Sequence, residues 1–317
     1  MIIQPMLDTT PASFTAAALS GIAPLPHLGV IRARGEDAAK FLQGQLTQDV
    51  VLMQPGEARL AAFCNAKGRM LASLQVLKCA ADELLLVTSA DTLAATLRRL
   101  SMFVLRAKLK LSDVTAEVQL RGLIGDAALS IAAGACPDFP EALEGLVFTI
   151  ALPAADGTPR ALWLAPADAP APAGPAVDAA DWLAAEVRTG VARITAPVAE
   201  AFVPQMLNYE SVDGVNFKKG CYPGQEVVAR SQFRGAIKRR GFVGWVDGAA
   251  QAGQDVFDSD APEQPVGLIA QAAPVAGGTV VIASLLLSAQ AQPLRVGGSD
   301  GAPLRGLHIP YALAQDI

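Results

Sequence analysis

The sequence predicts an α+β fold with two mixed units of helices and strands followed by a small C-terminal β-barrel. Between residues 28 and 164, runs typical of strands alternate with helical patterns. After Arg240 the strand patterns are short and broken by Gly and Pro up to Ile317, which favours a barrel. An Ala/Pro-rich segment, residues 166–175, indicates a linker. The expected divisions are 1–114, 115–177, 178–239 and 240–317.

The first unit is expected to have a mainly antiparallel sheet. A helix over 35–45 has one apolar stripe that includes Phe41 and Leu42. A second helix over 91–103 would begin with Asp91 as its N-cap. The turn at 65–68 separates two paired strands. The strands of this unit are predicted at 28–33, 59–64, 70–78, 83–88 and 108–111.

The second unit repeats this combination on a smaller scale. Its strands are predicted at 118–124, 147–152 and 161–164, with a helix over 126–133. A further helix over 179–189 follows the linker. The apolar run from Val280 to Leu287 is too short to span a membrane and indicates a buried strand of the barrel.

Composition favours a cytoplasmic protein that is not in a membrane. The chain is 52% hydrophobic and 17% charged, which is enough to form a buried core. It has no uninterrupted apolar run of about 18 residues, as a spanning helix requires. The first 14 residues have no Lys or Arg and contain Asp8, which argues against a secretory signal.

The cysteines do not form a metal-binding pattern. No two of them make a CxxC pair, and there are only two histidines, so no metal site is expected. Cys64 and Cys79 are expected in core strands. The four cysteines are Cys64, Cys79, Cys136 and Cys221.

The net charge of −5 excludes a protein that is basic throughout, but one segment is locally basic. Between residues 218 and 240 the only acid is Glu226. This run favours a polyanionic partner, although an ordinary solvated surface remains an alternative. Two more basic residues at the predicted hairpin, Lys67 and Arg69, leave the same alternatives open. The basic residues of the run are Lys218, Lys219, Arg230, Arg234, Lys238, Arg239 and Arg240.

Cys221 is the candidate reactive residue. Gly220 allows a tight loop, and Pro223 suits the first position of a helix. Glu226 would then lie in the first helical turn. A thiol at a helix start, preceded by two lysines, is in an environment that favours the thiolate. The alternative is a small residue buried against the start of the helix.

The same segment resembles a known family. Residues 219–226 read KGCYPGQE and are similar to the signature of YgfZ proteins, in the superfamily of the glycine-cleavage T-protein. Similar motifs occur at 39–49 (AKFLQGQLTQD), 64–70 (CNAKGRM), 202–205 and Asn208. The resemblance assigns supporting roles around Cys221 to Lys219, Gly220, Tyr222, Gly224, Gln225, Glu226 and Arg230.

The resemblance implies a three-domain aminomethyltransferase-like ring around a central hole that binds tetrahydrofolate or a derivative. Two positions that contact the pterin in the family correspond to Trp182 and Leu28. Trp182 also fits a core anchor on an amphipathic helix, and Leu28 replaces a residue that is often aromatic. The implied role is an accessory protein that supports iron–sulfur client proteins and tRNA modification, with tRNA or tRNA-modifying enzymes as partners.

Whether the chain is an enzyme is left open by one departure from the superfamily. T-proteins have a pair of aspartates shortly after the hairpin turn, and these positions correspond to Ala72 and Ser73. Neither side chain can act as a carboxylate acid or base. Two alternatives remain: a folate-dependent one-carbon transferase that uses a different acid, and a tRNA-binding module.

Overall fold

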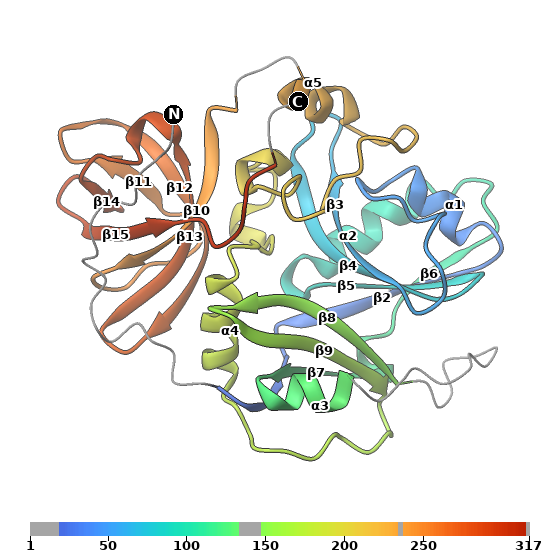
Figure 1. The fold of residues 1–317 in the computed structure, drawn as a ribbon. Coiled ribbons are helices and arrows are strands. Elements are labelled where there is room, and N and C mark those ends of the chain that lie inside the picture. Colours follow the sequence, from blue (N-terminus) through green and yellow to red (C-terminus); the bar gives the residue numbers. More distant parts are fainter. Residues whose placement is uncertain (1–18, 133–146, 234–236, 315–317) are drawn as a thin grey trace.

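A computed structural model describes residues 19–132, 147–233 and 237–314. It contains two antiparallel sheets and a closed barrel (Figure 1). In Figure 1 the barrel lies on the left, the first sheet at the upper right and the second sheet below it. The predicted α+β fold with a C-terminal barrel is therefore confirmed. Cys136 and Arg234 lie outside the described residues.

The first sheet has five strands in the order β3-β4-β5-β2-β6. Helices α1 (Ala38–Gln43) and α2 (Ala90–Ser101) cover one face, where Leu42 and Leu100 are fully buried. Helix α1 is shorter than predicted, and α2 begins after Ser89, so Asp91 lies in its first turn and is not the N-cap. The strands are β2 (Leu28–Arg34), β3 (Ala58–Cys64), β4 (Met70–Ala80), β5 (Glu83–Ser89) and β6 (Lys110–Asp113).

The second sheet has four strands in the order β1-β7-β9-β8. Helix α3 (Asp126–Ala132) contacts all four of these strands. The N-terminal strand β1 pairs with β7, so a segment that precedes the first sheet belongs to the second. The strands are β1 (Gly21–Pro24), β7 (Val118–Ile124), β8 (Phe148–Ala155) and β9 (Thr158–Pro166).

Helix α4 (Ala179–Arg188) packs between the sheets and the barrel. Trp182 and Ala185 join a core shared by both sheets, whereas Ala184 and Val187 pack with barrel residues. A Cβ on Gly122 of β7 would lie 2.5 Å from the Trp182 ring, so the indole occupies space that only glycine leaves. This close packing fixes the indole against the second sheet.

The segment after α4 returns to the first unit. Asn216 donates its backbone N–H to Thr47 O, and the Thr47 hydroxyl donates to Gly214 O. Two short 3₁₀ turns, Ala196–Val198 and Pro204–Leu207, precede helix α5 (Gln225–Phe233). Figure 1 shows α5 at the hairpin end of β3 and β4.

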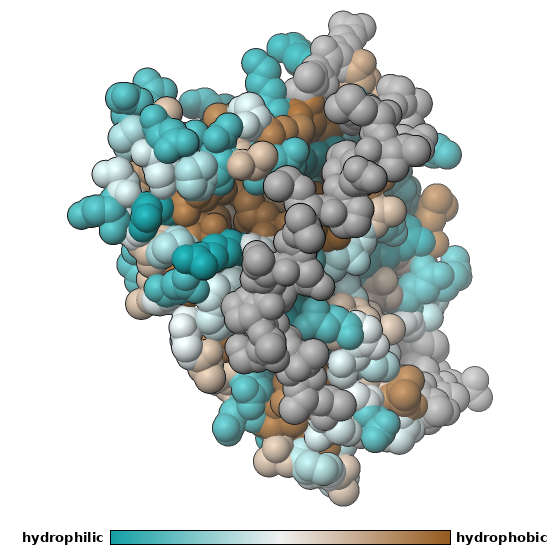
Figure 2. All heavy atoms as spheres, turned by 60° about the vertical axis from the view of Figure 1, so that its left-hand side comes forward, coloured by the Kyte–Doolittle hydropathy of each residue, from teal (hydrophilic) through white to brown (hydrophobic). Residues whose placement is uncertain are grey.

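The C-terminal barrel closes in the order β10-β13-β12-β11-β14-β15. Its interior is apolar, with Ile269, Val281 and Leu285 fully buried. Figure 2, turned toward the barrel side, shows many hydrophilic residues around a recess where hydrophobic residues gather. Within the described ranges, no helix has the length and apolar character that crossing a membrane requires. The strands are β10 (Arg239–Val246), β11 (Asp255–Asp258), β12 (Ala261–Val275), β13 (Gly278–Leu286), β14 (Leu294–Val296) and β15 (Ala302–His308).

Candidate functional site

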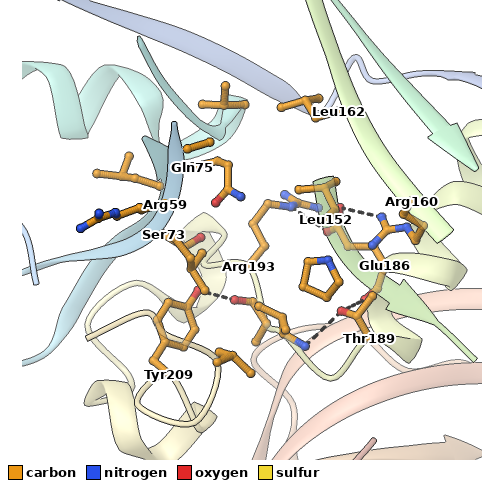
Figure 3. Close-up of a pocket in the computed structure, with 18 of the residues that line it drawn as sticks. Arg59, Ser73, Gln75, Leu152, Arg160, Leu162, Glu186, Thr189, Arg193 and Tyr209 are labelled. Carbon is orange, nitrogen blue, oxygen red and sulfur yellow. Dashed lines mark hydrogen bonds and ion pairs between the residues drawn. The ribbon is translucent and has the colours of Figure 1, made fainter. Parts of the chain in front are cut away.

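A cavity of about 270 Å³ lies where the two sheets, α4 and the returning segment meet (Figure 3). Ser73 and Gln75 from β4 lie on one side, and Arg160 and Glu186 lie on the other. Most of the wall is apolar, which suits a flat organic ring fixed by a few polar groups. The apolar side chains of the wall include Leu28, Leu60, Val87, Leu152, Leu162 and Trp182.

One wall combines an indole with a guanidinium group. The Arg160 Cζ lies 4.1 Å from the centroid of the Trp182 ring, within the range of a cation–π interaction. Burial lowers the pKa of Arg160 to about 10, although the charge of Glu186 opposes this shift. Within the part of the chain that the structure describes, the buried Trp182 Nε1 and Arg160 Nε have no hydrogen-bond partner. Unsatisfied donors at a cavity wall are typical of a site that a polar ligand completes.

Glu186 is the central hydrogen-bond acceptor on the polar side of the cavity. Its Oε1 accepts hydrogen bonds from Arg193 Nε at 2.9 Å and from Gln271 Nε2 at 2.6 Å. Among the described residues, the nearest basic groups to its Oε2 are His27 Nε2 at 3.9 Å and Arg160 Nη2 at 4.0 Å. Oε2 is therefore the oxygen with capacity for a further donor.

The Glu186 carboxylate is strongly ionised. Burial alone would raise its pKa, but the neighbouring Arg193, His27 and Arg160 together lower the pKa well below the usual range. An ionised carboxylate accepts hydrogen bonds and cannot donate a proton. At neutral pH Glu186 is therefore suited to bind a donor edge of a ligand, not to act as a general acid.

Strand alternation separates the two positions that correspond to the T-protein aspartates. Ser73 lines the cavity, whereas Ala72 is buried in the core beneath α1 and α2. The Ser73 Oγ accepts a hydrogen bond from Ile194 N at 2.9 Å, which ties the returning segment to β4. Ser73 thus supports the wall without supplying a charge.

The structure brings the two predicted pterin-contact residues to one cavity. Both Trp182 and Leu28 line it, and Trp182 is also a core anchor, so its two sequence interpretations are compatible. Sequence reasoning missed Arg160, Glu186 and Arg193. The signal that could have found Glu186 was its position four residues after Trp182, on the same helix face.

Cys221 is exposed and is not among the residues that line the cavity. Its loop is held by the preceding lysine. Lys219 Nζ donates to Gln43 O at 2.5 Å and to Leu46 O at 2.6 Å, and it lies 4.8 Å from the centroid of the Tyr222 ring. Burial lowers the pKa of Lys219 to about 8, opposed by Asp49 and Cys221. Lys219 therefore anchors the cysteine loop to the end of α1.

The cysteine loop also packs on the β3–β4 hairpin, so two sequence motifs meet. Gly224 has φ +79°, and a Cβ there would lie 2.4 Å from Asn65 O and 2.5 Å from Gly68 Cα. Gly220 does not have a positive φ, and a Cβ there would meet no atom of the described residues within 4 Å. Gly224, not Gly220, is the glycine that the loop requires.

The expected position of the helix start was wrong by two residues. Helix α5 begins at Gln225, because Pro223 and Gly224 form the turn before it. Glu226 does lie in the first helical turn, where its carboxylate pairs with Arg230 at 2.6 Å. Cys221 consequently lies four residues before the helix.

The expected basic face is smaller than the sequence suggested. Lys219 is buried at the end of α1, and Arg240 is buried and paired with Glu210. Arg239 and Arg69 are half-buried and donate to backbone carbonyls. Lys67, Lys218 and Lys238 are exposed. Among the described residues, no group of three or more His, Cys, Asp or Glu is arranged to hold a metal ion.

Substituting Gly224 by Ala is expected to destabilise the protein by roughly 2 kcal/mol, because alanine is strained at this φ and meets the hairpin backbone. The matched Gly220→Ala change should alter the free energy of unfolding by less than about 0.5 kcal/mol. Urea denaturation measures both. Equal effects of the two changes would contradict the assigned role of Gly224.

The chain is similar to known proteins in sequence and in fold. The GCVT N-terminal domain family matches residues 16–151. The YgfZ tRNA-modifying protein of Serratia proteamaculans is 29% identical over 310 residues, covering 92% of each chain. That of Edwardsiella ictaluri is 31% identical over 238 residues, covering 70% of this chain and 69% of the relative.

Among solved structures, the glycine cleavage aminomethyltransferase T of Bartonella henselae superposes with a TM-score of 0.59. The match covers 91% of this chain and 85% of that one at 16% identity, so it demonstrates a shared fold. The sequence relatives carry the assignment further: the chain belongs to the YgfZ family.

Proposed function

We propose that the central cavity binds a reduced folate, and that the chain is a folate-dependent accessory protein. It would support the assembly or repair of iron–sulfur proteins and tRNA modification. The observation that carries the folate proposal is the pairing of Trp182 with the ionised Glu186 in one cavity. The relatives named as tRNA-modifying proteins support the cellular role.

The lining residues fit a pterin. Its ring needs a flat apolar surface, which Trp182 of α4 and Leu28 of β2 provide. The 2-amino and N3–H groups of a pterin form a donor edge that matches a carboxylate, and Glu186 Oε2 has capacity to accept. The cavity volume of about 270 Å³ suits the ring system of a ligand, leaving a longer tail outside.

The protein groups around this ligand would position it and exclude water. Glu186 would orient the ring, held by Arg193 and Gln271. Tetrahydrofolate supplies one-carbon chemistry when bound. Cys221 would act at a separate place, as an exposed thiol presented to a client protein on the loop that Lys219 anchors.

Calorimetry with tetrahydrofolate tests the cavity. Replacing Glu186 by Gln should weaken binding at least about tenfold, because a charge-assisted hydrogen bond is lost. Trp182→Leu should weaken it through loss of the flat surface. The matched control is Glu226→Gln, which removes an exposed carboxylate and should leave affinity unchanged. Unchanged affinity in a folded Glu186→Gln protein would refute the assignment.

Complementation tests the role of the thiol. In cells that lack the gene, Cys221→Ala is expected to restore iron–sulfur enzyme activity poorly, while tetrahydrofolate affinity stays at the wild-type value. Gly220→Ala, a neighbouring change without a steric consequence, should restore activity. Full rescue by Cys221→Ala would remove the thiol from the mechanism and leave the folate site unaffected.

A further inference from the structure

The end of helix α2 carries an unusual exposed surface. Met102, Phe103 and Leu105 retain 68%, 44% and 85% of their accessible surface. Backbone hydrogen bonds from Phe103 N to Leu100 O and from Leu105 N to Phe103 O keep these residues in tight turns. Fully buried Leu100 anchors the helix beneath them. Three large apolar side chains are thus held in water at adjacent positions, a feature that marks interaction surfaces.

The same surface is basic in a protein of net charge −5. From Thr92 to Ser112 the sequence contains no Asp or Glu. Arg98, Arg99 and Arg106 are exposed, and within the described part of the chain none of them forms an ion pair. Arg98 and Arg99 stabilise the helix C-terminus, but this explains neither Arg106 nor the exposed apolar side chains. We define the α2-end surface as Arg98, Arg99, Met102, Phe103, Leu105 and Arg106.

A groove of about 510 Å³ continues from this surface along α2. Its lining includes Arg98, Arg99 and Met102 of the α2-end surface, the partly buried Leu71 of β4, and Asp91 in the first turn of α2. The wall opposite α2 is the segment around Ala199 and Glu200, which is fixed to β4 by the hydrogen bond from Glu200 N to Met70 O. The groove therefore has a preformed shape.

We propose that the α2-end surface and its groove dock a protein segment that carries apolar side chains next to acidic ones. Apolar side chains of the partner would cover Met102, Phe103 and Leu105 and enter the groove, and its carboxylates would pair with the three arginines. Arg, Met and Phe are enriched in protein interfaces. This site is separate from the folate cavity, and its occupancy does not depend on folate binding.

Charge and shape together favour this occupant over RNA. Arginines alone suit phosphates equally well. RNA contacts, however, use aromatic faces for stacking, and two of the three exposed apolar side chains, Met102 and Leu105, are aliphatic. Covering aliphatic surface requires an apolar partner. The docked segment would lie beside the hairpin whose turn supports Gly224 and the cysteine loop.

Photo-cross-linking of the full chain in cells tests this proposal. A benzoylphenylalanine probe replaces Met102, and the matched control carries it at Ala94, an exposed position earlier on α2. The expected result is a protein adduct at position 102 whose attached peptide combines apolar and acidic residues. The adduct should fall roughly tenfold with Arg98→Glu/Arg99→Glu and persist with Arg98→Lys/Arg99→Lys.

Arg106 lies after the end of helix α2. The charge reversal Arg106→Glu should also reduce the adduct, and a folding defect in α2 would not explain that loss. Circular dichroism checks each variant. Adducts to RNA or lipid, equal adducts at Ala94, insensitivity to charge reversal in folded variants, or no adduct at position 102 would each overturn the proposal.

Discussion

One half-buried carboxylate, that of Glu186, connects the two sheets, the returning segment and the barrel. Glu186 of α4 meets Arg193 of the returning segment and Gln271 of the barrel, and its other oxygen faces Arg160 of the second sheet. Arg193 in turn donates to Ser89 Oγ at the end of the first sheet. An ionised carboxylate shared in this way needs several donors to offset its desolvation. The arrangement that satisfies Glu186 therefore also fixes how the two sheets and the barrel surround the cavity.

Strand β4 links the two candidate sites, the cavity and the cysteine loop. Ser73 and Gln75 line the cavity, whereas the hairpin turn before Met70 packs against Gly224 of the cysteine loop. Because one strand and its hairpin contribute to both places, a ligand in the cavity and a partner at Cys221 would contact the same element. The two places also differ chemically: the cavity has an ionised carboxylate, and the loop has an exposed thiol.

Local patterns in the sequence predicted much of the fold. Periodicity predicted Val118–Ile124 to the residue and the other strands of the two sheets within a few residues, except β1, which it did not predict. The barrel was predicted from its broken strand pattern, without the bounds of most of its strands. The motifs directed attention to Trp182 and Leu28, which do line one cavity. Their role in folate binding stays a prediction, as does the reactivity of Cys221.

What the sequence could not predict depends on contacts between distant segments. The groups around Glu186 belong to residues that are far apart in the sequence, and no local pattern relates them. They are His27, Arg160, Arg193 and Gln271. The sequence does not show that Gly224 is the glycine the loop requires, because that need arises from the hairpin, about 160 residues earlier in the chain. The basic run included Arg240, whose burial results from its pairing with Glu210. Charge patterns show which residues are basic, but tertiary partners decide which of them reach solvent.

The most direct measurement is a crystal structure of the chain with tetrahydrofolate. We expect the pterin ring between β4 and α4, with its donor edge within hydrogen-bond distance of Glu186 and the ring against Trp182. Density for the ligand at another place, or no density at a saturating concentration, would contradict the folate assignment.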